Sequence, residues 1–137
     1  MLGGKSMDCI FCAGIEEHQL LLEPANYKVV FDIDPIQSGH LLIISKEHVE
    51  TLLAISDELF IELMTLQKQL IALLEREFHV DGVSIIQNNS HIMDEGTHFH
   101  VHIVPRYHDD QFWDHQKAVE KPIFINDLAE KLKLLAQ

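Results

Sequence analysis

The strongest constraint in this sequence is the seven-residue stretch His98–Val104, which reads HFHVHIV and alternates imidazole with apolar side chains. Successive side chains of a β-strand point to opposite faces of the sheet, so the alternation predicts a strand. Phe99, Val101 and Ile103 would then enter the core, and the three histidines would share the other face. At about 3.3 Å per residue, neighbouring histidines would stand roughly 6.6 Å apart and the outer two roughly 13 Å apart.

This histidine row has three interpretations. Because Zn–N bonds are about 2.0–2.1 Å long, a straight strand cannot easily direct all three rings at one ion, although two neighbours could share one. Three solvated surface histidines are a second interpretation. We favour a third, an imidazole nucleophile flanked by imidazole helpers, since the unperturbed pKa of about 6.5 leaves a histidine neutral near pH 7. Such a ring needs an acceptor that holds its other nitrogen in one tautomer.

Composition narrows the class of protein. The chain has 137 residues, of which 47% are hydrophobic and 23% charged, so we expect one compact domain with its own core. Twenty-two acidic against ten basic residues give a net charge of −12, which disfavours a nucleic-acid binder. No apolar run approaches the roughly 20 residues of a membrane helix. The opening residues contain no apolar signal core, so we expect a cytoplasmic protein.

The pattern of elements predicts an α+β domain. The expected elements are strands at 27–32, 40–45, 82–88 and 98–104, a long helix that begins after Ser56 and ends near Phe78, and a shorter helix from Asn126. Pro105 should close the last strand because it cannot donate to a ladder. Consecutive strands can pair as hairpins, so we expect a mainly antiparallel sheet with one long helix and a C-terminal helix.

The two cysteines of the chain, Cys9 and Cys12, form a C-x-x-C pair. In a reducing compartment such a pair indicates metal binding or redox chemistry before a structural disulfide. A thioredoxin-like function would place the pair beside a βαβ unit, which the expected order lacks. The pair by itself is consistent with a zinc site and with two reduced cysteines that bind no metal.

The histidine row resembles the His-φ-His-φ-His-φ-φ signature of the histidine triad (HIT) superfamily, where φ is an apolar residue. Other segments similar to HIT proteins follow in the family's order: CIFC at 9–12, FDIDP at 31–35, GHLLII at 39–44, KEH at 46–48 and VPR at 104–106. The resemblance covers residues 8–106. It implies a HIT-like fold in a single domain at 8–137, with an N-terminal extension at 1–7 and a tail at 107–137 that does not align.

The resemblance also implies an activity. Many HIT proteins cleave a purine nucleotide at its α-phosphate through a covalent nucleotidyl-histidine, with nucleoside phosphoramidates or dinucleoside polyphosphates as substrates. It implies His100 as the nucleophile, with His102, His98 and His40 beside it. The implied nucleotide-binding residues are Asp32, Gln87, Phe11, Phe31 and Ile33. A homodimer is implied as well, and no catalytic metal is required.

Some HIT proteins and the related galactose-1-phosphate uridylyltransferases hold zinc on two cysteines and two histidines. The matching residues here are Cys9, Cys12, His48 and His98. Such a set completes a tetrahedral zinc and leaves no open position for water. The resemblance therefore implies a structural zinc that ties the N-terminal segment to the triad strand.

One segment departs from the family. Much of the family has a Gly-Gln-Ser/Thr run before the triad, whereas this chain reads IMDEGT at 92–97, with Glu95 at the hydroxyl position. A carboxylate there repels phosphate unless it is protonated or turned away. Because of this departure, the sequence does not identify the leaving group of the reaction. It also favours an alternative function, a catalytically weak nucleotide-binding module that acts through protein partners.

Overall fold

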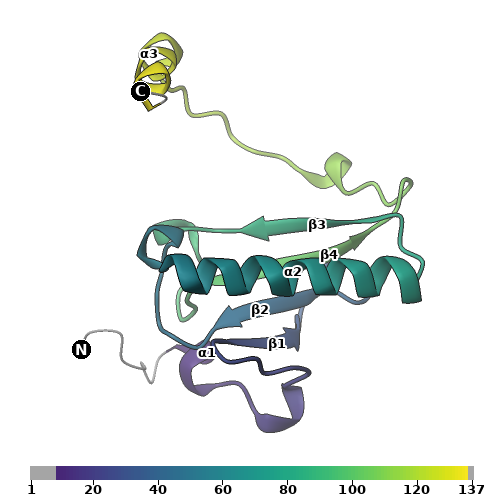
Figure 1. The fold of residues 1–137 in the computed structure, drawn as a ribbon. Helices are drawn as coiled ribbons and strands as arrows, with labels where there is room; N and C mark the ends of the chain where they lie inside the picture. Colours follow the sequence, from purple (N-terminus) through teal and green to yellow (C-terminus); the bar gives the residue numbers. More distant parts are fainter. Residues whose placement is uncertain (1–8, 136–137) are drawn as a thin grey trace.

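The computed structural model describes residues 9–135, so the predicted extension at 1–7 lies outside the described residues (Figure 1). The strands of the sheet are β1 (Tyr27–Phe31), β2 (Leu41–Ser45), β3 (Gly82–Gln87) and β4 (His100–Arg106). Their spatial order is β1-β2-β4-β3, and every neighbouring pair is antiparallel. The α-helices of the described chain are α1 (Ile10–Ala13), α2 (Asp57–Glu77) and α3 (Ile125–Leu135). The α+β class and the antiparallel sheet are confirmed.

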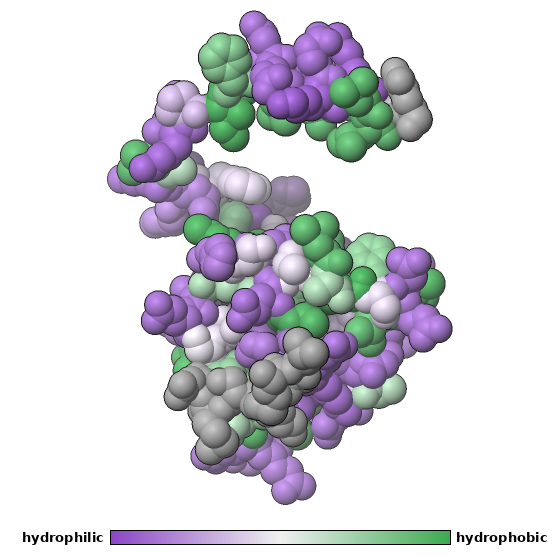
Figure 2. Space-filling model, turned by 90° about the vertical axis from the view of Figure 1, so that its left-hand side faces the viewer, coloured by the Kyte–Doolittle hydropathy of each residue, from purple (hydrophilic) through white to green (hydrophobic). Residues whose placement is uncertain are grey.

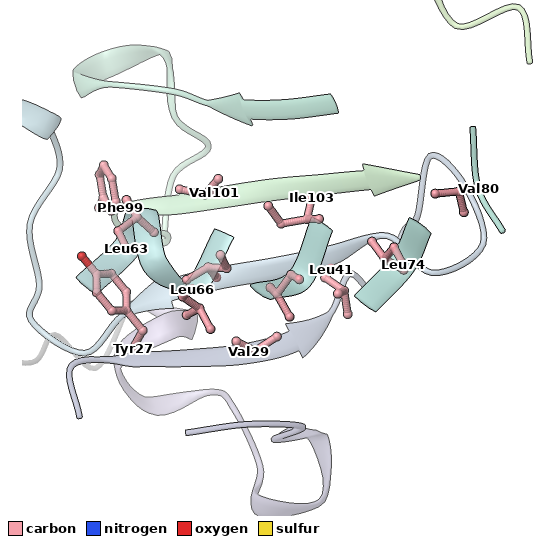
Figure 3. Packing of buried hydrophobic residues seen from close by; sticks show 12 residues of the cluster. Tyr27, Val29, Leu41, Leu63, Leu66, Leu74, Val80, Phe99, Val101 and Ile103 are labelled. Carbon is pink, nitrogen blue, oxygen red and sulfur yellow. The ribbon is translucent and has the colours of Figure 1, made fainter. Parts of the chain in front are cut away.

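Helix α2 covers one face of the sheet (Figure 1). It begins directly after Ser56, whose hydroxyl accepts a hydrogen bond from the Leu59 N–H at 3.3 Å. Asp57 and Glu58 place negative charge at the positive end of the helix dipole. The leucines buried on its inner face are Leu63, Leu66, Leu70 and Leu74. Figure 3 shows Leu63, Leu66 and Leu74 over Val29, Leu41 and Ile103 of the sheet.

The predicted orientation of the last strand is confirmed, whereas its bounds are not. Phe99, Val101 and Ile103 lie in the core under α2 and are 0–1% exposed (Figure 3). β4 begins at His100 rather than at His98, because Phe99 lies at a bend. There the Phe99 N–H donates to the carbonyl of Val49, which lies outside the sheet, at 2.7 Å.

Pro105 lies inside β4 and pairs with Val83, so the prediction that it closes the strand is wrong: the strand continues to Arg106. The neighbouring strand β2 begins at Leu41, which pairs with Ile103. Pro105 therefore has a strand partner on one side only, and a missing N–H is tolerated at such a position.

The other face of the sheet carries the histidines and is partly covered by the N-terminal segment. A second, smaller apolar cluster lies there: Val30, Leu42 and Ile44 are buried, and Phe11, Ile15 and Leu20 lie against them. Helix α1 belongs to this covering segment and lies beside β1 and β2 (Figure 1). The first residues of the described chain are thereby brought next to the histidine row.

The tail leaves the sheet after β4. A 3₁₀ turn at Trp113–His115 leads to residues 116–124, which have no regular structure, and then to α3. Figures 1 and 2 show α3 set apart from the rest of the described chain. Among the described residues, no helix is both long and apolar enough to cross a bilayer.

Candidate nucleotide and metal site

Four side chains meet where the N-terminal segment reaches the histidine row. The Nδ1 atom of His98 lies 3.2 Å from the Cys9 Sγ and 3.5 Å from the Cys12 Sγ, and the Nδ1 atom of His48 lies 3.0 Å from the Cys12 Sγ. The four ligand atoms all lie within 4.8 Å of one another. A tetrahedral zinc separates its sulfur and nitrogen ligands by about 3.6 Å, so the set fits such an ion.

The two histidines of this set have their outer nitrogens occupied. The Nε2–H of His98 donates to the Ser45 carbonyl at 2.6 Å, and the Nε2 of His48 lies 3.5 Å from a Glu50 carboxylate oxygen. Each ring therefore directs Nδ1 to the cysteines, which is the second-shell arrangement of metal-binding histidines. Burial lowers the pKa of His98 to about 4, so the ring is neutral and able to bind a metal at neutral pH.

His100 has one nitrogen held and one left over. Its Nδ1–H donates to the backbone carbonyl of His98 at 2.7 Å, which leaves a lone pair on Nε2. The ring is 7% exposed, and Phe11 contacts it edge-on with 4.9 Å between centroids. His100 thus has the acceptor-fixed tautomer that an imidazole nucleophile needs.

A second chain of hydrogen bonds fixes His102. The Ile36 N–H donates to the Nδ1 of His40 at 3.0 Å, so His40 carries its proton on Nε2. That Nε2–H donates to the Nδ1 of His102 at 2.9 Å. His102 is thereby protonated on Nε2, next to His100, with 4.8 Å between the ring centroids. One ring therefore offers a lone pair and its neighbour an N–H.

Asp32 lies beside this chain. One carboxylate oxygen lies 3.4 Å from the Nε2 of His40 and 3.7 Å from the Nδ1 of His102, and the other accepts the Asp34 N–H at 2.8 Å. Burial lowers the pKa of His40 and lowers that of His102 to about 4, and the negative charge of Asp32 opposes both shifts. Both imidazoles are therefore neutral at pH 7.

Two of the predicted nucleotide-binding residues are turned away from the histidines. Phe31 faces α2 and lines a groove with Leu70 and Leu74, because odd-numbered residues of β1 point to that side. Gln87 pairs with Val101 of the core, and its amide donates to backbone and side-chain oxygens of residues 88 and 89. Ile33 is 81% exposed. Val30, which sequence reasoning missed, lies on the histidine side with Phe11.

The unusual loop at 92–97 adjoins the site. The Gly96 carbonyl accepts the Ile10 N–H at 2.7 Å, and the Thr97 hydroxyl donates to the Asp94 carbonyl at 2.6 Å. Glu95 is exposed at a turn, whereas the charge of Asp94 acts on His102. The loop therefore presents carboxylates where much of the resembling family has an amide and a hydroxyl.

Two cavities lie away from the triad rings. One, of ≈ 380 Å³, is lined by Ile36, Gln37, Val104 and residues of the tail; the other, of ≈ 690 Å³, is the groove that contains Phe31. Neither is lined by His98, His100 or His102. The Phe11 ring lies against His100 and so restricts access to it.

Fold and site together define an α+β protein with an antiparallel sheet, a row of three imidazoles and a Cys₂His₂ set at one end of that row. The HIT domain family model matches residues 14–109. The chain therefore belongs to the HIT family.

Relatives and solved structures agree with this assignment. The chain is 34% identical to the adenosine 5′-monophosphoramidase of Saccharomyces cerevisiae over 102 residues, which cover 72% of this chain and 62% of that protein. A crystal structure of SMU.412c from Streptococcus mutans matches with a TM-score of 0.75 at 30% identity, over 100% of this chain and 90% of that one. A zinc-bound histidine triad protein from Mycobacterium smegmatis matches with a TM-score of 0.65 at 28% identity, over 85% of each chain.

Proposed function

We propose that the protein is a HIT-type nucleotide hydrolase or transferase that cleaves a purine nucleotide at the α-phosphate through a nucleotidyl-histidine intermediate. The observation that carries the proposal is the pairing of a free Nε2 lone pair on His100 with an Nε2–H on His102. The relatives that are named adenosine 5′-monophosphoramidases support this reaction class.

In the first step the Nε2 of His100 attacks the α-phosphorus, a P–N bond forms, and the bond to the leaving group breaks. The leaving group departs with the bonding electron pair and is then protonated. In the second step water attacks the same phosphorus, the P–N electron pair returns to Nε2, and the nucleoside monophosphate is released. The attacking water gives one proton to solvent, which balances the proton that the leaving group took from solvent. The His102 Nε2–H stabilises the negative charge on the phosphoryl oxygens in both steps.

Around the reacting atoms, Asp32 and Phe11 are the proposed nucleotide contacts that the structure brings close to the histidines. The carboxylate of Asp32, which can accept several hydrogen bonds, would also accept from the ribose hydroxyls, and Phe11 and Ile33 would border the base. The groove position of Phe31 gives no support for its contact with the base, and the pairing of Gln87 with Val101 gives none for a ribose contact.

The proposed zinc would be held by Cys9, Cys12, His48 and His98. With four protein ligands it supplies a cross-link and no reactive coordination position. The cross-link would fix His98, whose carbonyl accepts the Nδ1–H of His100, and so would orient the nucleophile. Cytoplasmic location and a homodimer remain predictions from the sequence and the resemblance.

The second candidate function is a catalytically weak nucleotide-binding module. The carboxylates of Asp94 and Glu95 favour it, because negative charge beside the phosphates opposes binding of the leaving group. Both functions require nucleotide binding, and they differ in whether a covalent adduct forms.

A rapid-quench experiment separates the two functions. The protein is mixed with adenosine 5′-phosphoramidate carrying ³²P at its phosphorus, quenched within milliseconds and digested, and the labelled peptide is identified. We expect label on His100, none in His100→Ala, and unchanged label in His18→Ala, whose side chain is 75% exposed. Nucleotide binding without an adduct or turnover would establish the module instead.

A further inference from the structure

Helix α3 carries an apolar stripe that no described residue covers. At about 100° per residue, one sector of the helix contains Ile125, Leu128, Leu132 and Leu135, with Phe124 just before it. Leu128 is 42% exposed, Leu132 53% and Leu135 80%. An isolated helix of 11 residues is marginally stable in water, so α3 needs a surface to fold against.

The body of the protein has a matching apolar groove, of ≈ 690 Å³, on the face of the sheet that α2 partly covers. Its exposed apolar side chains are Leu21, Leu22, Phe31, Leu73 and Phe78, which are 47–65% exposed. A contiguous apolar surface of this kind usually marks an interaction site. None of these residues belongs to the histidine row or to the Cys₂His₂ set.

We propose that α3 docks into this groove on a second copy of the chain, and that two copies exchange their C-terminal arms, defined as residues 116–135. The direction of the arm argues against docking on its own body. His115 and Gln116 line the smaller cavity together with Val104 and Arg106, whose side chains alternate onto the histidine face of β4. The groove lies on the other face, and Pro105 lines both cavities.

The arm therefore leaves from the face opposite the groove. In Figure 1 it runs away from the C-terminal end of α2, where the groove lies, and Figure 2 shows the same separation. The match to the Streptococcus mutans structure covers 100% of this chain, and so it includes the arm.

Length and charge fit this occupant. The groove follows α2 from Leu70 to Phe78, about 12 Å at 1.5 Å per residue, and the stripe from Leu128 to Leu135 is about 11 Å long. The acidic side chains of α3 are Asp127 and Glu130, and the basic ones are Lys131 and Lys133. The helix thus has zero net charge and adds no repulsion between two chains that each carry −12. A reciprocal exchange also closes as a two-fold dimer.

Cysteine cross-linking tests the exchange. Full-length Leu73→Cys and Leu132→Cys chains are mixed, oxidised with oxidised glutathione and analysed by mass spectrometry. We expect a disulfide dimer that contains one chain of each kind. The matched control replaces Leu132→Cys by Leu134→Cys, which lies on the same helix outside the stripe and is 65% exposed. Its yield should be at least tenfold lower.

A chain that carries both Leu73→Cys and Leu132→Cys tests whether the arm docks on its own chain instead. If the disulfide forms within that chain at high dilution and not between the mixed chains, the arm folds back and the exchange is refuted. If neither disulfide forms, the groove does not receive α3 at all, and the proposal is equally wrong.

Stability gives a second measurement that does not depend on cysteine chemistry. Leu132→Asp and Leu73→Asp should each lower the unfolding temperature by roughly 4 °C or more, and the double variant should lose no more than the larger single loss. Leu134→Asp should leave the temperature within about 1 °C of the original. Additive losses would contradict a shared contact.

Discussion

The imidazoles at the two ends of the histidine row have different partners. At one end, the imidazole nitrogens of His98 and His48 lie beside two thiols; at the other, His102 and His40 are joined to each other next to Asp32. Both groups bring three or more ligand atoms within 4.8 Å of one another. Only the first includes soft sulfur donors and enough ligands to complete a tetrahedral zinc.

The difference shows that histidines on the same strand can take different roles. His98 directs Nδ1 inward to the thiols and gives its Nε2–H to a backbone carbonyl, so none of its nitrogens is left for a ligand. His102 accepts at Nδ1 and keeps its Nε2–H for a ligand. The hydrogen bond of each ring, rather than its residue type, determines its role. His100 lies between the two ends and is held by the backbone of the first.

The largest predicted effect concerns the cysteine end. Cys9→Ser should abolish binding of the proposed zinc and lower the unfolding temperature by roughly 10 °C or more, because structural zinc contributes folding free energy directly. Zinc per chain is measured by plasma mass spectrometry and unfolding by calorimetry. His102→Gln serves as the control and should keep one zinc per chain. Equal zinc loss in both variants would contradict the prediction that zinc binds only at the cysteine end of the row.

The next effect concerns turnover. His102→Gln should lower kcat by about 10²–10³-fold, the usual cost of removing one donor to a developing oxyanion, while zinc content stays unchanged. The measurement is steady-state hydrolysis of adenosine 5′-phosphoramidate. The control is His18→Ala, which should keep the original kcat because the His18 side chain is 75% exposed. A rise in KM with kcat preserved would mean that His102 only binds the substrate.

The sequence predicted the orientation of some strands and not of others. The alternation at His98–Val104 predicted which side chains enter the core, because three apolar and three imidazole residues alternate strictly. The face of Phe31 could not be predicted in the same way. Its strand contains adjacent buried valines, Val29 and Val30, so the pattern of period two gives no preferred face.

Backbone groups limit sequence prediction of the site. The tautomers depend on the Ile36 N–H and on the carbonyls of Ser45 and His98, and every residue type supplies such groups. The sequence therefore predicted that the triad nucleophile needs an acceptor without naming it. The helix at the C-terminal end was predicted, but its separation from the sheet depends on packing that periodicity does not encode.

The third prediction uses pH. The folded pKa of His102 is about 4 and its unfolded value about 6.5, so the unfolded chain binds the proton first as the pH falls. His102 should therefore contribute no pH dependence above about pH 6.5, and towards pH 4 it should lower the free energy of unfolding by up to about 3 kcal/mol. This loss adds to those from His98 and His40, whose pKa values burial also lowers. Denaturant unfolding of metal-free protein measures this. His102→Gln should make the fall shallower, and an unchanged slope would refute the assignment.

The smallest predicted effect asks whether the carboxylate beside each end matters equally. Glu50 is 62% exposed and lies 3.5 Å from the outer nitrogen of His48, whereas the Asp32 side chain is 15% exposed and lies between two imidazoles. Solvent screens the first contact, so Glu50→Gln should weaken zinc affinity less than tenfold, the low end of the range for outer-shell partners. Competition with a chromophoric chelator measures this affinity. Asp32→Asn should leave zinc affinity unchanged and weaken nucleotide binding instead, and a zinc defect in that variant would show that the two ends are coupled through the strand.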